Sequence, residues 1–139
     1  MNAVAEPLTV GDLMTRDPIV AYVDMPLNEA AELMDFYRVT GLPVIDWTGA
    51  LAGVISQTDL LHARTTEALW QAWPGLAVRH LMTSPAVSVT AGTSVEAAAT
   101  LMENLKIHRL VVTDMDGTAV VGILAVADLV RAMAARGIA

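Results

Sequence analysis

The sequence predicts an α+β fold made of two copies of one β-α-β-β-α unit, and three observations carry this prediction. Val10–Thr15 (VGDLMT) is echoed 68 residues later by Val78–Thr83 (VRHLMT), and a proline soon follows each. Gly53–Leu60 recurs as Gly122–Leu129, with the pattern G-h-h-x-x-x-D-L in both copies. Between these segments, short β-type runs alternate with stretches of helical periodicity. Self-similarity over this length indicates a duplication.

The first half of each copy is predicted to be a strand followed by a helix. Ile19–Val23 and Ala86–Thr90 are short β-type runs after a proline. Apolar residues then recur at helical spacing, namely Leu27, Ala30, Ala31 and Met34 in the first copy and Val95, Ala98, Ala99, Met102 and Leu105 in the second. Pro26 marks the start of the first helix, and Thr93 with Glu96 predicts a capping box at the start of the second.

The second half of each copy is predicted to be a β-hairpin followed by a helix. The hairpins combine Leu42–Asp46 with Leu51–Ser56 around the turn Trp47–Gly49, and Leu110–Asp114 with Val120–Ala125 around the turn Met115–Gly117. The closing helices are predicted to start near Gln57 and Val126, and the second to end near Arg136-Gly137.

These elements divide the chain into a first repeat over residues 8–64, a connector over 65–77 and a second repeat over 78–135. The connector carries Trp70 and Trp73 on a short amphipathic segment and ends at Pro74-Gly75. Two tryptophans in such a place favour packing or a dimer contact over a platform for a ligand.

Composition narrows the class of protein. The net charge is −7, and eight Lys and Arg are spread thinly, so a nucleic-acid-binding face is not expected. Hydrophobic residues make up 55% of the chain, which favours a homodimer that buries apolar surface. No run reaches the roughly 20 apolar residues of a membrane span. The absence of cysteine, and of a signal-peptide pattern in residues 1–7, leads us to expect a cytoplasmic protein.

The order of these motifs, twice over at constant spacing, resembles a pair of CBS (cystathionine-β-synthase-type) domains. The resemblance rests on the L-M-T-x-x-P-type starts, the strands LPVID and LVVTD, and the two G-h-h-x-x-x-D-L endings, and it covers about Val10 to Met133. It implies that the two repeats pack with pseudo-two-fold symmetry into one Bateman module with two clefts. It also implies that the clefts bind adenosine-containing ligands such as AMP, ADP, ATP, S-adenosylmethionine or NAD, and that two modules pair into a disc.

The family's ligand signature, G-h-x-S/T-x-x-D/N, matches GVISQTD at Gly53–Asp59. The resemblance implies that Asp59 holds the ribose hydroxyls and that Ser56 and Thr58 contact sugar or phosphate. The remaining implied contacts are the purine against Ile19, Val20 and Val54, with backbone groups of Thr40 and Gly41 at its edge. A second interpretation stays open, because Ser56 and Asp59 also fit a capping box that needs no ligand.

The second copy, GILAVAD, departs from the signature, since Ala125 and Ala127 replace the two hydroxyl residues before Asp128. Its cleft is therefore expected to be the weaker or empty one, with Asp128 as a favourable first-turn charge. The resemblance implies that His108 and Arg109 face the cleft of Asp59, where they would meet phosphates of the ligand; Arg109 is favoured because guanidinium binds phosphate through two bonds. The alternative is that both are ordinary polar residues at a strand start.

Neither a metal site nor a catalytic centre is predicted. The three histidines lack metal-binding spacing, and no Ser lies in a G-x-S-x-G context. We therefore expect a stand-alone regulatory module with no catalytic cofactor, whose adenine nucleotide is a regulatory ligand and whose output goes to a separate effector protein. Two alternatives remain: a dimerisation scaffold without a ligand, and an accessory subunit of an enzyme or transporter.

Overall fold

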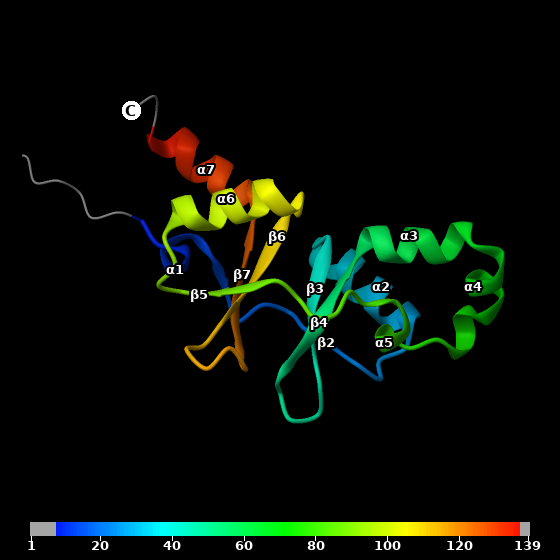
Figure 1. Cartoon of the computed structure of the whole chain (residues 1–139). Helices are drawn as coiled ribbons and strands as arrows, with labels where there is room; N and C mark the ends of the chain where they lie inside the picture. Colours follow the sequence, from blue (N-terminus) through cyan, green and yellow to red (C-terminus); the bar gives the residue numbers. More distant parts are fainter. Residues whose placement is uncertain (1–7, 137–139) are drawn as a thin grey trace, which may run out of the picture. The chain divides into compact units, whose positions relative to one another are not determined.

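The computed structural model describes residues 8–136, the last of them by its backbone alone. The signal-peptide prediction concerns residues 1–7, and the predicted end of the last helix includes Gly137. Both lie outside the described range. The elements are, in order, α1 (Val10–Leu13), β1 (Thr15–Arg16), β2 (Ala21–Tyr22), α2 (Leu27–Tyr37), β3 (Gly41–Ile45), β4 (Leu51–Ser56), α3 (Gln57–Thr65), α4 (Glu67–Ala72), η1 (Trp73–Gly75), α5 (Val78–Leu81), β5 (Ser88–Thr90), α6 (Val95–Leu105), β6 (Arg109–Thr113), β7 (Val120–Ala125) and α7 (Val126–Arg136) (Figure 1). The predicted α+β class is confirmed.

The chain forms two compact units that do not coincide with the two sequence repeats. The central unit runs from Pro18 to Ala86, and the split unit combines the N-terminal segment through Asp17 with the chain from Val87 onward. Each unit therefore contains the strands and long helices of one repeat, together with the L-M-T start of the other repeat.

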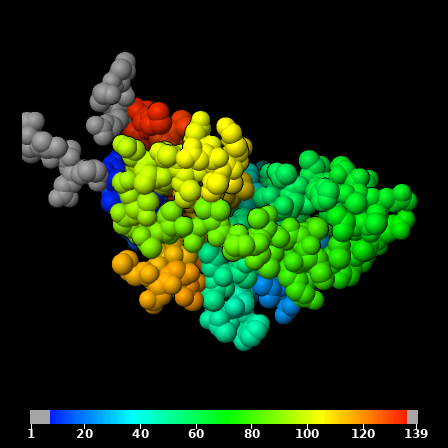
Figure 2. Space-filling view, viewed as in Figure 1, coloured from blue at the N-terminus to red at the C-terminus, as the bar shows by residue number. Residues whose placement is uncertain are grey.

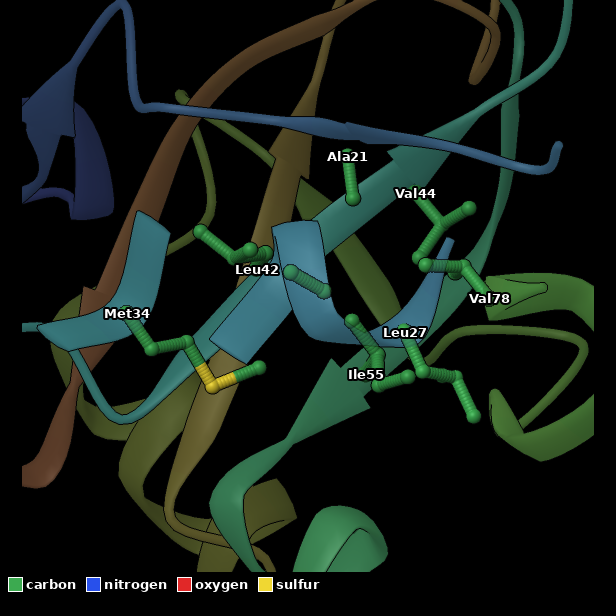
Figure 3. Close-up of a cluster of buried hydrophobic side chains, with 8 residues drawn as sticks. Ala21, Leu27, Met34, Leu42, Val44, Ile55 and Val78 are labelled. Carbon is green, nitrogen blue, oxygen red and sulfur yellow. The ribbon is translucent and has the colours of Figure 1, made fainter. Parts of the chain in front are cut away.

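The central unit is built on the sheet β2-β3-β4, in which β2 is parallel to β3 and β3 is antiparallel to β4. Its core is a cluster of side chains that point toward one another between the sheet and α2, namely Ala21, Leu27, Ala30, Met34, Leu42, Val44, Ile55 and Val78 (Figure 3). Val78 comes from the second repeat, so α5 completes the core of the first repeat's sheet.

The split unit is built on the sheet β1-β7-β6-β5, in which β5 is parallel to β6, and β7 is antiparallel to both β6 and β1. Its buried core combines Val10, Ala98, Met102, Leu110, Val112, Leu124 and Leu129. Val10 comes from the first repeat, which makes the exchange of starting segments reciprocal.

The repeated glycines explain how each start docks on the opposite copy. The segment Met82-Thr83 crosses β4, and a Cβ on Gly53 would lie 2.6 Å from the carbonyl oxygen of Thr83. In the split unit, a Cβ on Gly122 would lie 2.9 Å from the carbonyl oxygen of Thr15. Real Cβ contacts stay beyond about 3.0 Å, so both positions need glycine for this close approach.

The predicted boundaries hold best where a hairpin runs into a helix. β4, β7 and the starts of α3 and α7 lie at the predicted residues. Both hairpins are antiparallel, and their turns place Gly49 and Gly117 at φ of 88° and 75°, where other residues are strained. The β3–β4 turn projects from the central unit (Figure 2).

Three predicted details are corrected by the structure. The expected strand Ile19–Val23 is limited to Ala21–Tyr22, the two residues in register with the end of β3. Val23 adds one hydrogen bond, from its N–H to the carbonyl oxygen of Ile45 at 3.1 Å. The expected strand Ala86–Thr90 is likewise limited to Ser88–Thr90. The expected capping box of Thr93 with Glu96 is wrong, since Ser94 caps α6 and its Oγ accepts the N–H of Ala97 at 3.0 Å.

The connector forms α4 and η1, and its two tryptophans differ in burial. Trp73 packs against the core of the central unit, as expected for a packing residue. Trp70 is 42% exposed, with the Arg64 guanidinium 4.6 Å from the centre of its ring.

Among residues 8–136, none of the helices has the length and hydropathy needed to cross a membrane.

Candidate functional site

The junction of β4 with α3 forms the capping box that the sequence predicts. Ser56 is the N-cap residue in extended conformation, and its Oγ accepts the N–H of Asp59 at 3.2 Å. In return, Oδ2 of Asp59 accepts the N–H of Ser56 at 2.8 Å and its hydroxyl at 3.0 Å. The strand ends here because the Ser56 side chain takes over a backbone donor that has no partner within the helix.

The capping box leaves binding capacity at the same junction. Within the described part of the chain, Oδ1 of Asp59 accepts no hydrogen bond, and neither the N–H nor the hydroxyl of Thr58 is bonded. Asp59 is half-buried and Thr58 is exposed, so these groups are reachable from solvent. An anionic oxygen beside free donors at a helix start suits a sugar hydroxyl next to a phosphate. The capping and binding interpretations of Asp59 are therefore compatible.

Thr40 and Gly41 lie directly beside this junction. The carbonyl oxygen of Thr40 accepts the N–H of Gln57, the first residue of α3, at 2.9 Å. Gly41 is the register partner of Ser56 across the β3–β4 ladder. The structure thus brings together five predicted site residues, which are Thr40, Gly41, Ser56, Thr58 and Asp59.

The three apolar residues predicted to contact a purine lie near the same sheet in different roles. Val54 is two residues before Ser56 on β4, and it exchanges two backbone hydrogen bonds with Thr83, of 3.0 and 2.9 Å. Ile19 and Val20 precede β2 and are half-buried, and Ile19 packs against the core of the central unit. Part of the surface of Ile19 is therefore already used for folding.

The equivalent junction of β7 with α7 is closed by protein groups. Oδ2 of Asp128 accepts the N–H of Ala125 at 2.8 Å, and Oδ1 accepts a hydrogen bond from Arg131 at 3.1 Å. Asp128 is 8% exposed. The carboxylate is thus more than a first-turn charge, because it accepts the N–H of the residue before the helix and forms an ion pair with Arg131. Arg131 was not predicted, although a D-x-x-R spacing on a helix is a recognisable signal.

His108 and Arg109 belong to the split unit, as does Asp128. The carbonyl oxygen of His108 accepts the N–H of Val126 at 3.0 Å, which repeats the contact of Thr40 with Gln57. Arg109 begins β6 opposite Ala125 and is half-buried, whereas His108 is exposed. Both residues therefore lie at the positions of Thr40 and Gly41 in the second copy.

Comparison with known proteins gives the family. The model of the CBS domain matches residues 10–65 and 78–135. Among curated relatives, a homoserine O-acetyltransferase of Methanocorpusculum labreanum is 33% identical over 118 residues, which are 85% of this chain and 23% of that protein. The CBS domain-containing protein CBSX2 of Arabidopsis thaliana is 33% identical over 150 aligned positions, covering 89% of this chain and 63% of that protein. The chain thus spans under two thirds of the length of these relatives.

Solved structures agree with this assignment. A crystal structure of CBSX2 in complex with AMP has a TM-score of 0.79 at 38% identity, covering 90% of this chain and 95% of that one. The CBS domain pair of protein MJ0100, in complex with 5′-methylthioadenosine and S-adenosyl-L-methionine, has a TM-score of 0.82 at 26% identity, covering 94% of this chain and 99% of that one. With two matched segments in the order that the duplication requires, the chain belongs to the CBS domain family and carries a tandem pair of these domains.

Proposed function

We propose that this chain is a regulatory module that binds an adenosine-containing ligand at the β4–α3 junction and signals its occupancy to a partner protein. The observation that carries the proposal is the difference between the two junctions. Asp59 keeps one carboxylate oxygen free beside the unbonded N–H and hydroxyl of Thr58, whereas both oxygens of Asp128 are bonded within the protein.

The adenosine class is supported by the ligands named in the related structures. CBSX2 was crystallised with AMP, and the MJ0100 domain pair with two adenosyl compounds. A ribose offers two neighbouring hydroxyls, and a carboxylate accepts hydrogen bonds from both. In this proposal Asp59 holds the ribose, Ser56 and Thr58 contact sugar or phosphate, and Ile19, Val20 and Val54 lie against the purine.

Further contacts to the ligand are proposed from the loops that begin β3 and β6. Backbone groups of Thr40 and Gly41, which lie beside the β4–α3 junction, would read the edge of the purine. His108 and Arg109 would meet the phosphates, since guanidinium forms paired, charge-assisted hydrogen bonds with phosphate oxygens. AMP, ADP and ATP would then be distinguished mainly by Arg109.

The proposal is one of binding and regulation without catalysis. Among residues 8–136, His, Asp and Glu form no group of three or more that could hold a metal ion.

We also propose that the chain is a homodimer. On α7 the apolar residues Val126, Val130 and Met133 are 40%, 55% and 68% exposed, and they line a hollow of about 370 Å³ between α6 and α7. Apolar surface of this kind marks an interaction face.

A thermal-shift screen against AMP, ADP, ATP, S-adenosylmethionine, NAD and GTP tests the proposal, with isothermal titration calorimetry for each positive compound. A ligand at about 100 times its Kd stabilises the folded chain by about 2.7 kcal/mol, which raises Tm by several degrees. Stabilisation by adenine compounds and not by GTP is expected. If protein shown to be ligand-free responds to none of them, the dimerisation scaffold becomes the better account.

A further inference from the structure

A groove runs along one side of α2 in the central unit, and its lining includes none of the residues of the β4–α3 junction; we call it the α2 groove. Its volume is about 560 Å³, and Met25 and Leu33 are its apolar part. Phe36 and Tyr37 stand at its end, with their rings edge to face and their centroids 4.9 Å apart. Phe36 is 77% exposed and Tyr37 is 47% exposed. A pair of aromatic rings therefore faces solvent at the end of the helix.

Three carboxylates, those of Glu29, Glu32 and Asp35, edge the same groove. They follow one another at three-residue steps, so that about 9 Å of helix axis separates the first from the last at a rise of about 1.5 Å per residue. All three are exposed, and within residues 8–136 none of them forms an ion pair. Glu29 lies in the first turn, where a negative charge is favourable, but like charges on neighbouring helix positions repel one another. The helix itself therefore gains nothing from adding Glu32 and Asp35 on the same side.

The duplication supplies an internal comparison, because α6 is the counterpart of α2 and has the same length of 11 residues. The core positions keep their character, with Leu27, Ala30, Ala31 and Met34 replaced by Val95, Ala98, Ala99 and Met102. Three groove positions change, with Glu29, Glu32 and Phe36 replaced by Ala97, Thr100 and Asn104, whereas Asp35 keeps its acidic character as Glu103. Since α6 forms without them, the side chains of Glu29, Glu32 and Phe36 are not required for the helix to form.

We propose that the α2 groove docks a basic amphipathic helix of a partner protein. Lys or Arg side chains one helical turn apart would face Glu29, Glu32 and Asp35, which gives charge complementarity. An apolar side chain, or the stem of a cation stacked on a ring, would pack on Phe36 and Tyr37. A second copy of this chain fits less well, because it brings 15 acidic against eight Lys and Arg residues.

This inference goes beyond the proposed function, because none of the residues of the α2 groove belongs to the predicted ligand site. It identifies the surface through which the module would contact its effector protein and the kind of segment that would bind there. The groove proposal and the ligand-site proposal can therefore be tested separately, by measuring both peptide binding and nucleotide binding on the same variants.

The test uses the full chain and a fluorescein-labelled, helix-forming Leu/Lys peptide of about five turns, with binding followed by fluorescence anisotropy at about 0.15 M NaCl. The variant is Glu29→Lys/Glu32→Lys. Its matched control is Glu67→Lys/Asp116→Lys, which makes the same change in net charge at two exposed sites outside the α2 groove and outside the hollow between α6 and α7. Phe36→Ala is compared with Trp47→Ala, which removes an 87% exposed aromatic from the β3–β4 turn.

We expect the α2 double variant to weaken peptide binding by about tenfold or more and the control pair by less than about twofold, because a specific contact outweighs general charge attraction. Phe36→Ala should weaken binding and Trp47→Ala should not. Equal losses in the α2 variant and the control pair, or no binding by the wild-type chain, would overturn the proposal. A change of oligomeric state in the α2 variant, seen by analytical ultracentrifugation, would assign the groove to self-association instead and would also overturn it.

Discussion

Arg131 donates a 3.1 Å hydrogen bond to Oδ1 of Asp128, and the N–H of Ala125 occupies the other oxygen of the same carboxylate. The equivalent carboxylate in the first copy, Asp59, is engaged through Oδ2 alone. The two copies of the strand–helix junction thus differ in how their carboxylate is bonded. Both oxygens of Asp128 accept hydrogen bonds from the protein, whereas Asp59 keeps one oxygen that can accept a hydrogen bond from a ligand.

This asymmetry predicts unequal effects of removing the two carboxylates. Asp59→Ala should abolish binding of the nucleotide found by thermal-shift screening, whereas Asp128→Ala should leave most of it. Both substitutions remove the carboxylate that accepts the N–H of the residue before the helix, and losing such a hydrogen bond costs about 1 kcal/mol of folding free energy. Calorimetry well below the Tm of each variant separates this cost from the loss of ligand contacts. Equal losses of affinity would show that the ranking of the two junctions is wrong.

The close approach of Thr83 to Gly53 predicts a loss of stability in Gly53→Ala. The new Cβ would lie 2.6 Å from a backbone carbonyl oxygen, and crowding of this kind costs about 1–3 kcal/mol. Gly92→Ala is the matched control, since nothing lies within 4 Å of its Cβ position. Urea unfolding of both variants measures the difference. If the Gly53→Ala protein is as stable as the Gly92→Ala protein, the Met82-Thr83 segment can shift to accommodate the Cβ with no loss of folding free energy.

The parts of the fold that were predicted from the sequence are those set by nearby residues. The hairpin turns need Gly49 and Gly117 at positive φ, and Ser56 marks its helix start with a hydroxyl. The exchange of the two L-M-T starts was not predicted, because a repeated motif shows that two segments are alike but not which strand each one contacts. The same limit applies to Ser94, which caps α6 although Thr93 beside it offers the same chemistry.

The candidate site divides in the same way. The capping box at Ser56 and Asp59 was visible as a pattern of two residues three apart, and the structure contains it. The closure of Asp128 depends on a guanidinium that the signature does not include. The α2 groove was missed because helical periodicity identifies the buried face, while Glu29, Glu32 and Phe36 lie on faces that carry no periodic signal.

The turn between β3 and β4 predicts a pH-dependent contribution to stability. The hydroxyl of Thr48 donates to Asp46, and the N–H groups of Thr48 and Ala50 do the same, so the pKa of this carboxyl lies below its ordinary value of 3.8 in the folded chain. The folded state then binds the proton less tightly than the unfolded state. The contribution is therefore present above the unfolded pKa and is lost as pH falls through the folded pKa.

Asp46→Asn tests this contribution because an amide keeps the turn but cannot ionise. The free-energy gap between wild type and variant, from urea unfolding, should be largest above about pH 5 and should narrow as the solution becomes more acidic. Asp116→Asn in the β6–β7 turn is the control for removing one exposed negative charge. A gap that widens in acid would contradict the assigned direction of the pKa shift.

Arg109 predicts how phosphates contribute to recognition. If its guanidinium holds them, Arg109→Ala should weaken ADP and ATP far more than adenosine, because adenosine lacks the group that is recognised. Arg109→Lys should recover part of the loss, since an ammonium keeps the charge but not the paired hydrogen bonds. Arg64→Ala removes the same charge from the last turn of α3 and should spare both ligands. Calorimetric Kd values for adenosine and ATP decide the matter. A uniform loss for adenosine and ATP would instead assign Arg109 to holding the start of β6 opposite Ala125, where it begins its strand.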